Sequence, residues 1–535
     1  MSIELEKQEM SAATMVEDVA NDQDLQLGES LIEKERASSV WASAKAHKII
    51  LAHSIAAFFA GGVFGYDSVI NGASISMPAF MLYFGAMTPD HQLYVPSIWA
   101  SLWTAMSYLL QAIGGFGIGF VSDRIGRKWS CVLACCVSIV GVGIQYAATS
   151  RGVLLGGKMV NGLAIGCILA SATSWASEIS PVRLRGPIQS AIVMSTVLMQ
   201  AIGLVTIRVY VPNIHEHAFR IVFAVQWAWP AITLVLFALM PESPSWLLMK
   251  GKDVAARKVL SRLYGSNNNI DARFALLRKQ VEHERKEMLQ NGAGGYLELF
   301  KGANLKRTFT VFWLFLGAGL NGASLLSQNI YFLIIAGLPA IHAFDVGIGG
   351  FGLAILTIVA SWFCMEKIGR RLIWLTGVTV NILVMAIIGA LYYAHNHSSL
   401  WAIAILMNVL IAWQILTMTS TAWVICAEVS SYRLRIKTQA VGVISNAAVT
   451  WFFTFIVPYM YNTDAGNLGA RTAFIFMGTS IMLLVGSWYL VPDLSGFTTA
   501  EVDWLYEQRI APRNFQNFAD GRAKEGAAAQ IHDVK

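Results

Sequence analysis

Two charged residues, Asp67 and Lys158, stand inside long apolar stretches of the sequence. Charged side chains in apolar segments of membrane length are rare and usually functional. Each lies about four residues from the end of its segment, roughly 6 Å deep at about 1.5 Å per residue, so the two side chains could meet. A carboxylate next to an ammonium ion is held ionised, and it would take up a proton if the two groups separated. The two residues are therefore a candidate proton-coupling pair, with a static structural ion pair as the alternative.

Acidic residues and arginines form two matching sets in the polar stretches between apolar runs, and the second set repeats the first at offsets of 243 and 250 residues. An acidic side chain near a helix end can form charge-assisted bonds with arginines of neighbouring loops, across the two halves of the chain. Such bonds would close a cytosolic gate in one state and break in another. The alternative is that the arginines only set membrane topology. The gate residues are Asp123, Arg124, Arg127, Glu178, Arg183, Arg185, Glu366, Arg370, Arg371, Glu428, Arg433 and Arg435.

Uncharged polar side chains within the apolar runs supply a candidate solute site. A sugar-like molecule needs amide and hydroxyl partners and an aromatic platform for its C–H face. Each Asn or Gln could instead form a hydrogen bond between helices, and a Trp could lie at the membrane interface. The candidates are Gln200, Asn321, Gln328, Asn329, Trp423 and Asn446, with Gln111 as a further residue of the central cavity.

The composition places these residues in a membrane protein, since 55% of the residues are hydrophobic and only 13% are charged. A helix needs about 20 apolar residues to cross the hydrocarbon core. Twelve such spans are expected, starting near residues 50, 97, 129, 154, 187, 221, 308, 345, 373, 400, 437 and 471.

The distribution of Lys and Arg predicts the topology. With both termini in the cytosol, 34 of the 39 Lys and Arg residues face the cytosol, as the positive-inside rule requires. The expected fold is an all-α membrane protein of twelve transmembrane helices, in two six-helix repeats around a midplane site. Its parts are a disordered cytosolic tail (1–48), a first half (49–240), a cytosolic amphipathic linker (241–307), a second half (308–491) and a cytosolic tail (492–535).

Other function classes find no support in the sequence. It has no nucleophile–base constellation, phosphate-cradling loop or metal-ligand spacing, so it indicates neither an enzyme nor a cofactor. The net charge of +6 is explained by cytosolic loops rather than by nucleic-acid binding. The expected partners are the lipid bilayer, a small solute and protons, and the chain is expected to be a monomer. Asn396 begins a glycosylation sequon in a short loop that we place outside.

Several of these motifs resemble those of the sugar porter family of the major facilitator superfamily. The resemblance rests on residues 119–128, 178–186, 241–244 and 366–371, which together span nearly the whole membrane region. A closer similarity is to the fungal α-glucoside (maltose-type) branch. It rests on Gly65-Tyr66-Asp67 with Pro78 and Phe80, Tyr331-Phe332 before Ala336-Gly337, Pro458 to Asn462 with Asn467 and Gly469, and residues 500–509. The double glutamine of the hexose branch is replaced by Gly317-Ala318 and their neighbours, and its helix 5 glutamine is replaced by Val193.

The resemblance implies a secondary transporter of the plasma membrane that moves an α-glucoside such as maltose, or a related saccharide, by proton symport. In proton-coupled relatives an Asp at the position of Asp67 is the protonation site, and many have Arg where this chain has Lys158. Gln200 and Trp423 match ligand-facing positions. The alternatives are an uncoupled facilitator, a non-sugar solute (a polyol, a quinate-like acid or a fungal secondary metabolite) and a non-transporting nutrient receptor.

Overall fold

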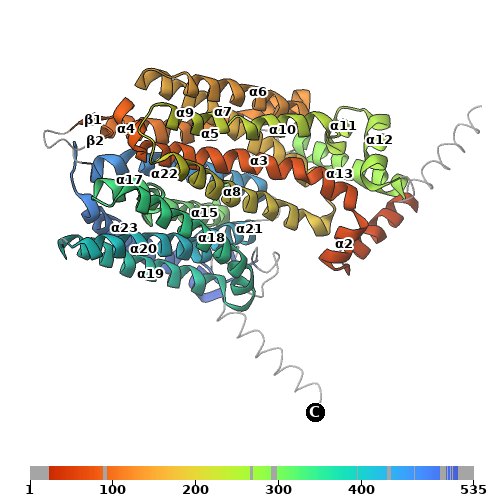
Figure 1. The fold of residues 1–535 in the computed structure, drawn as a ribbon. Helices are drawn as coiled ribbons and strands as arrows, with labels where there is room; N and C mark the ends of the chain where they lie inside the picture. The colour runs from red at the N-terminus through yellow and green to blue at the C-terminus, as the bar shows by residue number, and fades with distance from the viewer. Residues whose placement is uncertain are drawn as a thin grey trace, which may run out of the picture.

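A computed structural model describes most of the chain. The described residues are 23–494, with gaps at 36, 88–92, 266–268, 291–297, 395, 431–434 and 463, and several residues between 502 and 515. Apart from one short hairpin, the described elements are helices, and the long helices run side by side (Figure 1).

The first half consists of long apolar helices. They are α3 (Lys48–Ala73), α5 (Ser97–Ile125), α6 (Arg127–Tyr146), α7 (Arg151–Ile179), α8 (Val182–Tyr210) and the pair α9 (His217–Val225) and α10 (Ala228–Leu239). The second half repeats this arrangement. Its helices are α15 (Gly302–Leu320), α16 (Ala323–Ser327), α17 (Asn329–Ile335), α18 (Ala340–Lys367), α19 (Arg370–Leu391), α20 (His397–Gln414), α21 (Ser420–Val429), α22 (Arg435–Tyr461) and α23 (Thr472–Leu490).

Among the described residues, 11 helices are long and apolar enough to cross a membrane. They begin within a few residues of the expected starts. The remaining expected span, from residue 308, is not one helix, because the chain breaks between α15 and α16 at Gly322, whose φ is +82°. This backbone conformation suits glycine. The side chain of Asn321 accepts a hydrogen bond from the Ala323 N–H at 2.9 Å and so stabilises the turn. The seventh helix is therefore discontinuous.

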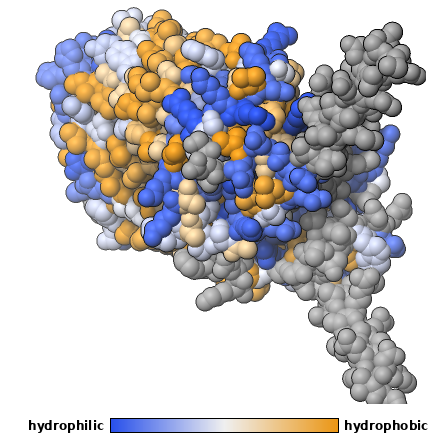
Figure 2. Space-filling view, turned by 90° about the vertical axis from the view of Figure 1, so that its right-hand side faces the viewer, coloured by the Kyte–Doolittle hydropathy of each residue, from blue (hydrophilic) through white to orange (hydrophobic). Residues whose placement is uncertain are grey.

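The two ends of the bundle differ. At one end, called the linker end here, lie α11 (Pro244–Met249), α12 (Asp253–Tyr264) and α13 (Ile270–Gln290), the short amphipathic helices expected between the halves. At the other, the hairpin end, lie α4 (Pro78–Phe84) and the strands β1 (Ala86–Met87) and β2 (Leu93–Tyr94) (Figure 1). Seen from the linker end, hydrophilic side chains gather on the face beside an apolar flank (Figure 2). This end carries the linker, which the positive-inside rule predicts to be cytosolic.

The apolar cores show how the halves meet. At the hairpin end, one buried cluster contains residues of both halves, for example Tyr66 and Phe223 with Tyr331 and Phe476. Toward the linker end, the described residues form separate clusters, one within the first half and one within the second. The halves are therefore joined at the hairpin end and packed independently at the linker end.

The expectation of disorder over residues 1–48 is wrong for its described part. Residues 23–35 are helical, and α2 (Val40–Ala46) follows them. This segment docks on α13, since Glu35 accepts a 2.5 Å bond from Arg273 and lies 3.3 Å from His47. Burial alone would raise the pKa of Glu35, but the hydrogen bonds from His47 and Arg273 and the Arg273 charge outweigh it and hold the pKa below its ordinary value.

We predict that Glu35→Ala releases the amino-terminal helix from α13. Glu35 and Arg273 are mostly buried, and a hydrogen bond between charged groups contributes about 1.5–3 kcal/mol. Limited proteolysis near residues 37–39 should therefore become about tenfold faster or more. Because the pKa of Glu35 is lowered, its contribution to the docking of the amino-terminal helix is complete above about pH 5. This contribution is lost only when the pH falls far enough to protonate the carboxylate. Glu29→Ala is the matched control, since its pair with Lys279 is exposed and contributes little. Equal proteolysis of both variants would contradict the docking.

Candidate functional site

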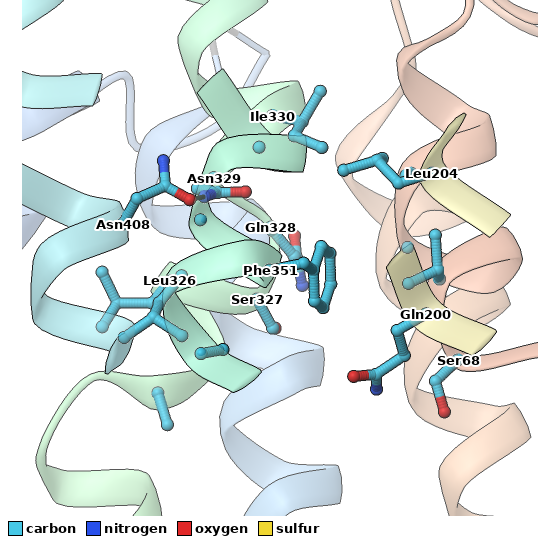
Figure 3. A pocket seen from close by; sticks show the side chains of 18 of the residues that line it. Ser68, Gln200, Leu204, Leu326, Ser327, Gln328, Asn329, Ile330, Phe351 and Asn408 are labelled. Atoms are coloured by element: carbon cyan, nitrogen blue, oxygen red, sulfur yellow. Dashed lines mark hydrogen bonds between the residues drawn. The ribbon is translucent and has the colours of Figure 1, made fainter. Parts of the chain in front are cut away.

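A cavity of about 290 Å³ lies between the two halves, in the middle of the bundle. Gln200 of α8 and Ser68 of α3 face it from the first half, and Gln328, Asn329 and Asn408 face it from the second (Figure 3). Three of the predicted solute-binding residues, Gln200, Gln328 and Asn329, are thus brought together. The volume is near the lower limit of small-molecule sites, which are about 300–1,000 Å³.

Gln328 has the polar group best placed for a ligand. Its side-chain oxygen accepts a 2.7 Å hydrogen bond from the Tyr461 hydroxyl. Its amide nitrogen is buried, and no described atom bonds to it. A buried donor without a partner costs about 1–3 kcal/mol, so a ligand oxygen at this position would be stabilised. The Asn329 side-chain amide makes a weaker hydrogen bond, donating to the Asn408 side-chain oxygen at 3.5 Å.

The rest of the cavity wall is apolar or uncharged. Leu204, Leu326, Ile330 and Phe351 provide its apolar surface (Figure 3). None of the described residues that line it is Asp, Glu, Lys, Arg or His. Since an ionic ligand would need a counter-charge in so buried a place, the cavity suits a neutral molecule with hydroxyl or carbonyl groups and an apolar face.

A π-helix, Ile415–Thr419, separates α20 from α21 beside the cavity, and its first and last residues line the cavity wall. Single π turns within α-helices are frequently found at functional sites. Gln414, directly before it, donates to the Asn321 carbonyl at 3.1 Å and to the Asn381 side chain at 2.8 Å. These bonds connect α20 to the break between α15 and α16 in the seventh expected span.

Other predicted solute-binding residues lie elsewhere. Asn321 is buried in the helix break, where its side chain bonds to the backbone. Trp423 is 47% exposed and packs edge-on against Phe315, with ring centroids 4.7 Å apart. Neither they nor Asn446 or Gln111 are among the residues that line the cavity. Their roles as ligand contacts stay predictions without support from this geometry.

Asp67 and Lys158 are both fully buried, in neighbouring helices, as the sequence predicts. The two described side chains form no direct ion pair. Asp67 instead accepts hydrogen bonds from amide groups, at 2.7 Å from Asn161 and 2.6 Å from Gln226 on one oxygen, and at 2.7 Å from Asn71 on the other. Lys158 donates to the Asn71 backbone carbonyl at 3.3 Å. The pair is thus joined through Asn71.

Sequence reasoning missed these three amides. Asn71 follows Asp67 by four residues and Asn161 follows Lys158 by three, so each lies on the same helix face as its charged neighbour. That spacing was the available signal. Gln226 gave no such signal, because it lies in another helix at the joint between α9 and α10.

At the linker end, the predicted acid–arginine pairs form, but within each half. Arg127 bonds to Glu178 at 3.0 Å and to Asp123 at 3.1 Å, and in the second half Arg370 bonds to Glu428 at 3.1 Å. The described pairs form no bond across the halves here; such bonds are expected only in the state in which this end is closed, so that expectation stays a prediction. The separate cores at this end explain this pairing within each half, because the halves do not close there.

The remaining gate residues are placed as follows. Arg124, Arg183 and Arg185 are exposed, and Arg371 donates to the Trp488 carbonyl at 2.8 Å. Arg433 and the side chains of Glu366 and Arg435 lie outside the described residues. Glu242 was missed: one of its oxygens accepts from the Arg127 and Lys128 N–H groups, at 2.9 and 3.1 Å, at the amino terminus of α6. Asn396 is exposed beside α20, and its glycosylation stays a prediction.

Residues 53–506 match the family model described as "Sugar (and other) transporter". The chain belongs to this family. It is therefore a major facilitator transporter and not an enzyme. A relative from Aspergillus fumigatus, "MFS transporter fmqE", is 41% identical and covers 91% of this chain and 92% of its own. The "General alpha-glucoside permease" of Saccharomyces cerevisiae is 26% identical, over 87% of this chain and 77% of its own.

Among solved structures, the fold is similar to the inward open conformation of the xylose transporter XylE from E. coli. The TM-score is 0.65 at 18% identity, covering 85% of this chain and 99% of that one. This likeness confirms the expected fold class.

We predict that Arg127→Ala slows transport with little change in the amount of protein at the cell surface. Arg127 is mostly buried and holds α5, α6 and α7 together through two carboxylates. A network of charge-assisted bonds of this kind contributes about 1.5–3 kcal/mol, so the maximal rate should fall about tenfold or more. Arg183→Ala, an exposed arginine of the same face, should change the rate less than twofold. A normal rate for the Arg127 variant would contradict its role.

Proposed function

We propose that this sugar transporter family member moves a neutral, sugar-like solute across the plasma membrane by alternating access, coupled to protons. The observation that carries the proposal is the uncharged cavity between the halves, whose wall includes Gln328 with an amide nitrogen that has no partner among the described atoms. Gln200, Gln328 and Asn329 are the proposed solute contacts, and Phe351 is the proposed platform for the apolar face of the solute. An α-glucoside such as maltose is the first substrate to test, since one relative is named for that class.

Proton coupling is proposed at Asp67. The carboxylate is buried beside Lys158 and is held by three amide donors, so its charge is stabilised without a direct ion pair. Thr104 and Tyr108 of α5 line the cavity, and the hydroxyl of Ser107, between them in the sequence, accepts a hydrogen bond from the Asn71 side-chain amide at 3.1 Å. A change in the cavity can thus reach the Asp67 cluster through α5. An uncoupled facilitator, with Asp67 in a structural role only, is the alternative.

A second candidate is a neutral solute that is not a sugar. The apolar wall of Leu204, Leu326, Ile330 and Phe351 favours it, and the name of the 41% identical relative specifies no sugar. A polyol or an uncharged secondary metabolite fits this wall. A quinate-like acid fits poorly, because the described lining offers no cation for its carboxylate.

Transport in yeast without its own hexose and maltose carriers tests the proposal. We expect uptake of radiolabelled maltose that collapses when a protonophore is added. Uptake that survives the protonophore and only equilibrates would identify a facilitator. No maltose uptake, with the protein confirmed at the surface, would favour the non-sugar candidate, which competition by uncharged non-sugar compounds can then examine.

For Asp67→Asn, we predict loss of accumulation against a gradient, with solute exchange retained. The amide cannot carry a proton through the cycle, but it fits the site, because the Asn71 and Gln226 side-chain oxygens have no partner among the described atoms and can accept its N–H groups after turning. Accumulation should fall at least tenfold while exchange changes less than threefold. Concentrative uptake by this variant would rule out Asp67 as the coupling site.

A further inference from the structure

The chain after α22 is bonded to the other half of the protein at the hairpin end. The carboxylate of Asp464 accepts hydrogen bonds from both the N–H and the hydroxyl of Ser97, the first residue of α5, and the N–H bond is 2.8 Å long. A carboxylate at a helix amino terminus satisfies free N–H groups and is attracted by the helix dipole. A residue of the second half therefore caps a helix of the first.

Beside this cap, the second half also binds the backbone of Val95. The Asn462 amide donates to the Val95 carbonyl at 2.8 Å, and the Tyr331 hydroxyl accepts from the Val95 N–H at 2.9 Å. Tyr331 and Asn462 bond to each other at 3.3 Å, and both are almost completely buried. The backbone N–H and carbonyl of Val95 are thus both hydrogen-bonded by side chains of the other half.

The same segment reaches the cavity. Tyr461 precedes Asn462, and its hydroxyl donates the 2.7 Å bond to Gln328 described above. Tyr461 is 1% exposed and packs against the rings of Tyr331 and Phe332. Adjacent residues therefore make the contact with the cavity wall and the contact with the other half.

We propose that Tyr461, Asn462 and Asp464 form a latch that holds the hairpin end closed and senses the solute through Gln328. The sensing part of this proposal rests on the proposed function of the cavity, whereas the closing part does not. Val95 and Ser97 lie in one short segment of the first half. Opening the hairpin end therefore requires the bonds of this segment to Tyr331, Asn462 and Asp464 to break together. These are positioning residues for transport and make no contact with the solute.

The physical link runs through the Gln328 amide. A solute oxygen that accepts from the Gln328 nitrogen polarises the amide and makes its oxygen a stronger acceptor for the Tyr461 hydroxyl. Bound solute therefore stabilises the latched state, and its departure weakens the latch. A further contact across the halves at this end, Arg208 with Asp345 at 2.6 Å, is considerably more exposed, so it contributes less.

A cysteine in the interface reports on closure. Val95→Cys keeps the backbone groups and replaces a fully buried side chain. In a chain whose natural cysteines are replaced, and which still transports, the rate of labelling by a membrane-impermeant maleimide measures opening of the hairpin end. Without solute, Asp464→Ala should raise this rate about tenfold, and Asp464→Asn, which keeps the shape, should raise it less. Glu216→Gln is the control, because Glu216 pairs with Arg220 within one half. An unchanged rate for Asp464→Ala overturns the latch.

The link to the cavity is tested in the same assay. Tyr461→Phe removes one hydroxyl and keeps the ring, so it should raise labelling about fivefold without solute, the effect of one hydrogen bond. An unchanged rate overturns the link whatever the substrate is. Maltose should slow the labelling of the Val95→Cys thiol when Tyr461 is present and should not slow it in the Tyr461→Phe variant. Equal slowing in both also overturns the link. If maltose slows neither, while Asp464→Ala opens the end, the sugar assignment fails and the latch stands.

Discussion

A carboxylate in the membrane interior has to find its hydrogen bonds within the protein, and much of the first half is arranged around meeting this need for Asp67. Donors come from α3, α7 and the joint of α9 and α10, so these helices must approach closely. Small residues allow close helix packing beside this cluster: a Cβ on Gly65 of α3 would lie 2.1 Å from the Thr196 carbonyl oxygen of α8.

The second organising feature is the unequal contact between the halves. They share an apolar core at the hairpin end, where hydrogen bonds to Val95 and Ser97 also cross the interface. Toward the linker end, ion pairs such as Arg127 with Glu178 stiffen each half internally. Rigid halves that touch at one end are what a rocking motion needs, because the internal bonds survive while the interface changes.

The sequence predicted the membrane spans, the linker and the repeat well, because these depend on hydrophobicity and spacing alone. It also predicted that Asp67 and Lys158 lie inside the bundle and that Gln200, Gln328 and Asn329 line the cavity, which the structure confirms. The sequence could not predict features that depend on the direction of a side chain or on contacts between residues far apart in the chain. Trp423 is not among the residues that line the cavity, and the Asn321 side chain bonds to the backbone in the helix break at Gly322, which no periodicity signals. The docking of Glu35 on Arg273 joins residues 238 positions apart, beyond the reach of local patterns.

The π-helix at Ile415–Thr419 affects how this protein can be aligned with its relatives. A π turn holds about one residue more than an α turn, and each residue turns a helix by about 100°. Consider a relative in which the segment equivalent to α20 and α21 is α-helical throughout. An alignment without a gap would pair the residues of the two chains one to one, but the paired side chains beyond the π turn would point in different directions. Roles transferred by column to α21, including the one assigned to Trp423, would then fall on the wrong face. An alignment gap of one residue within 415–419 would restore the correspondence.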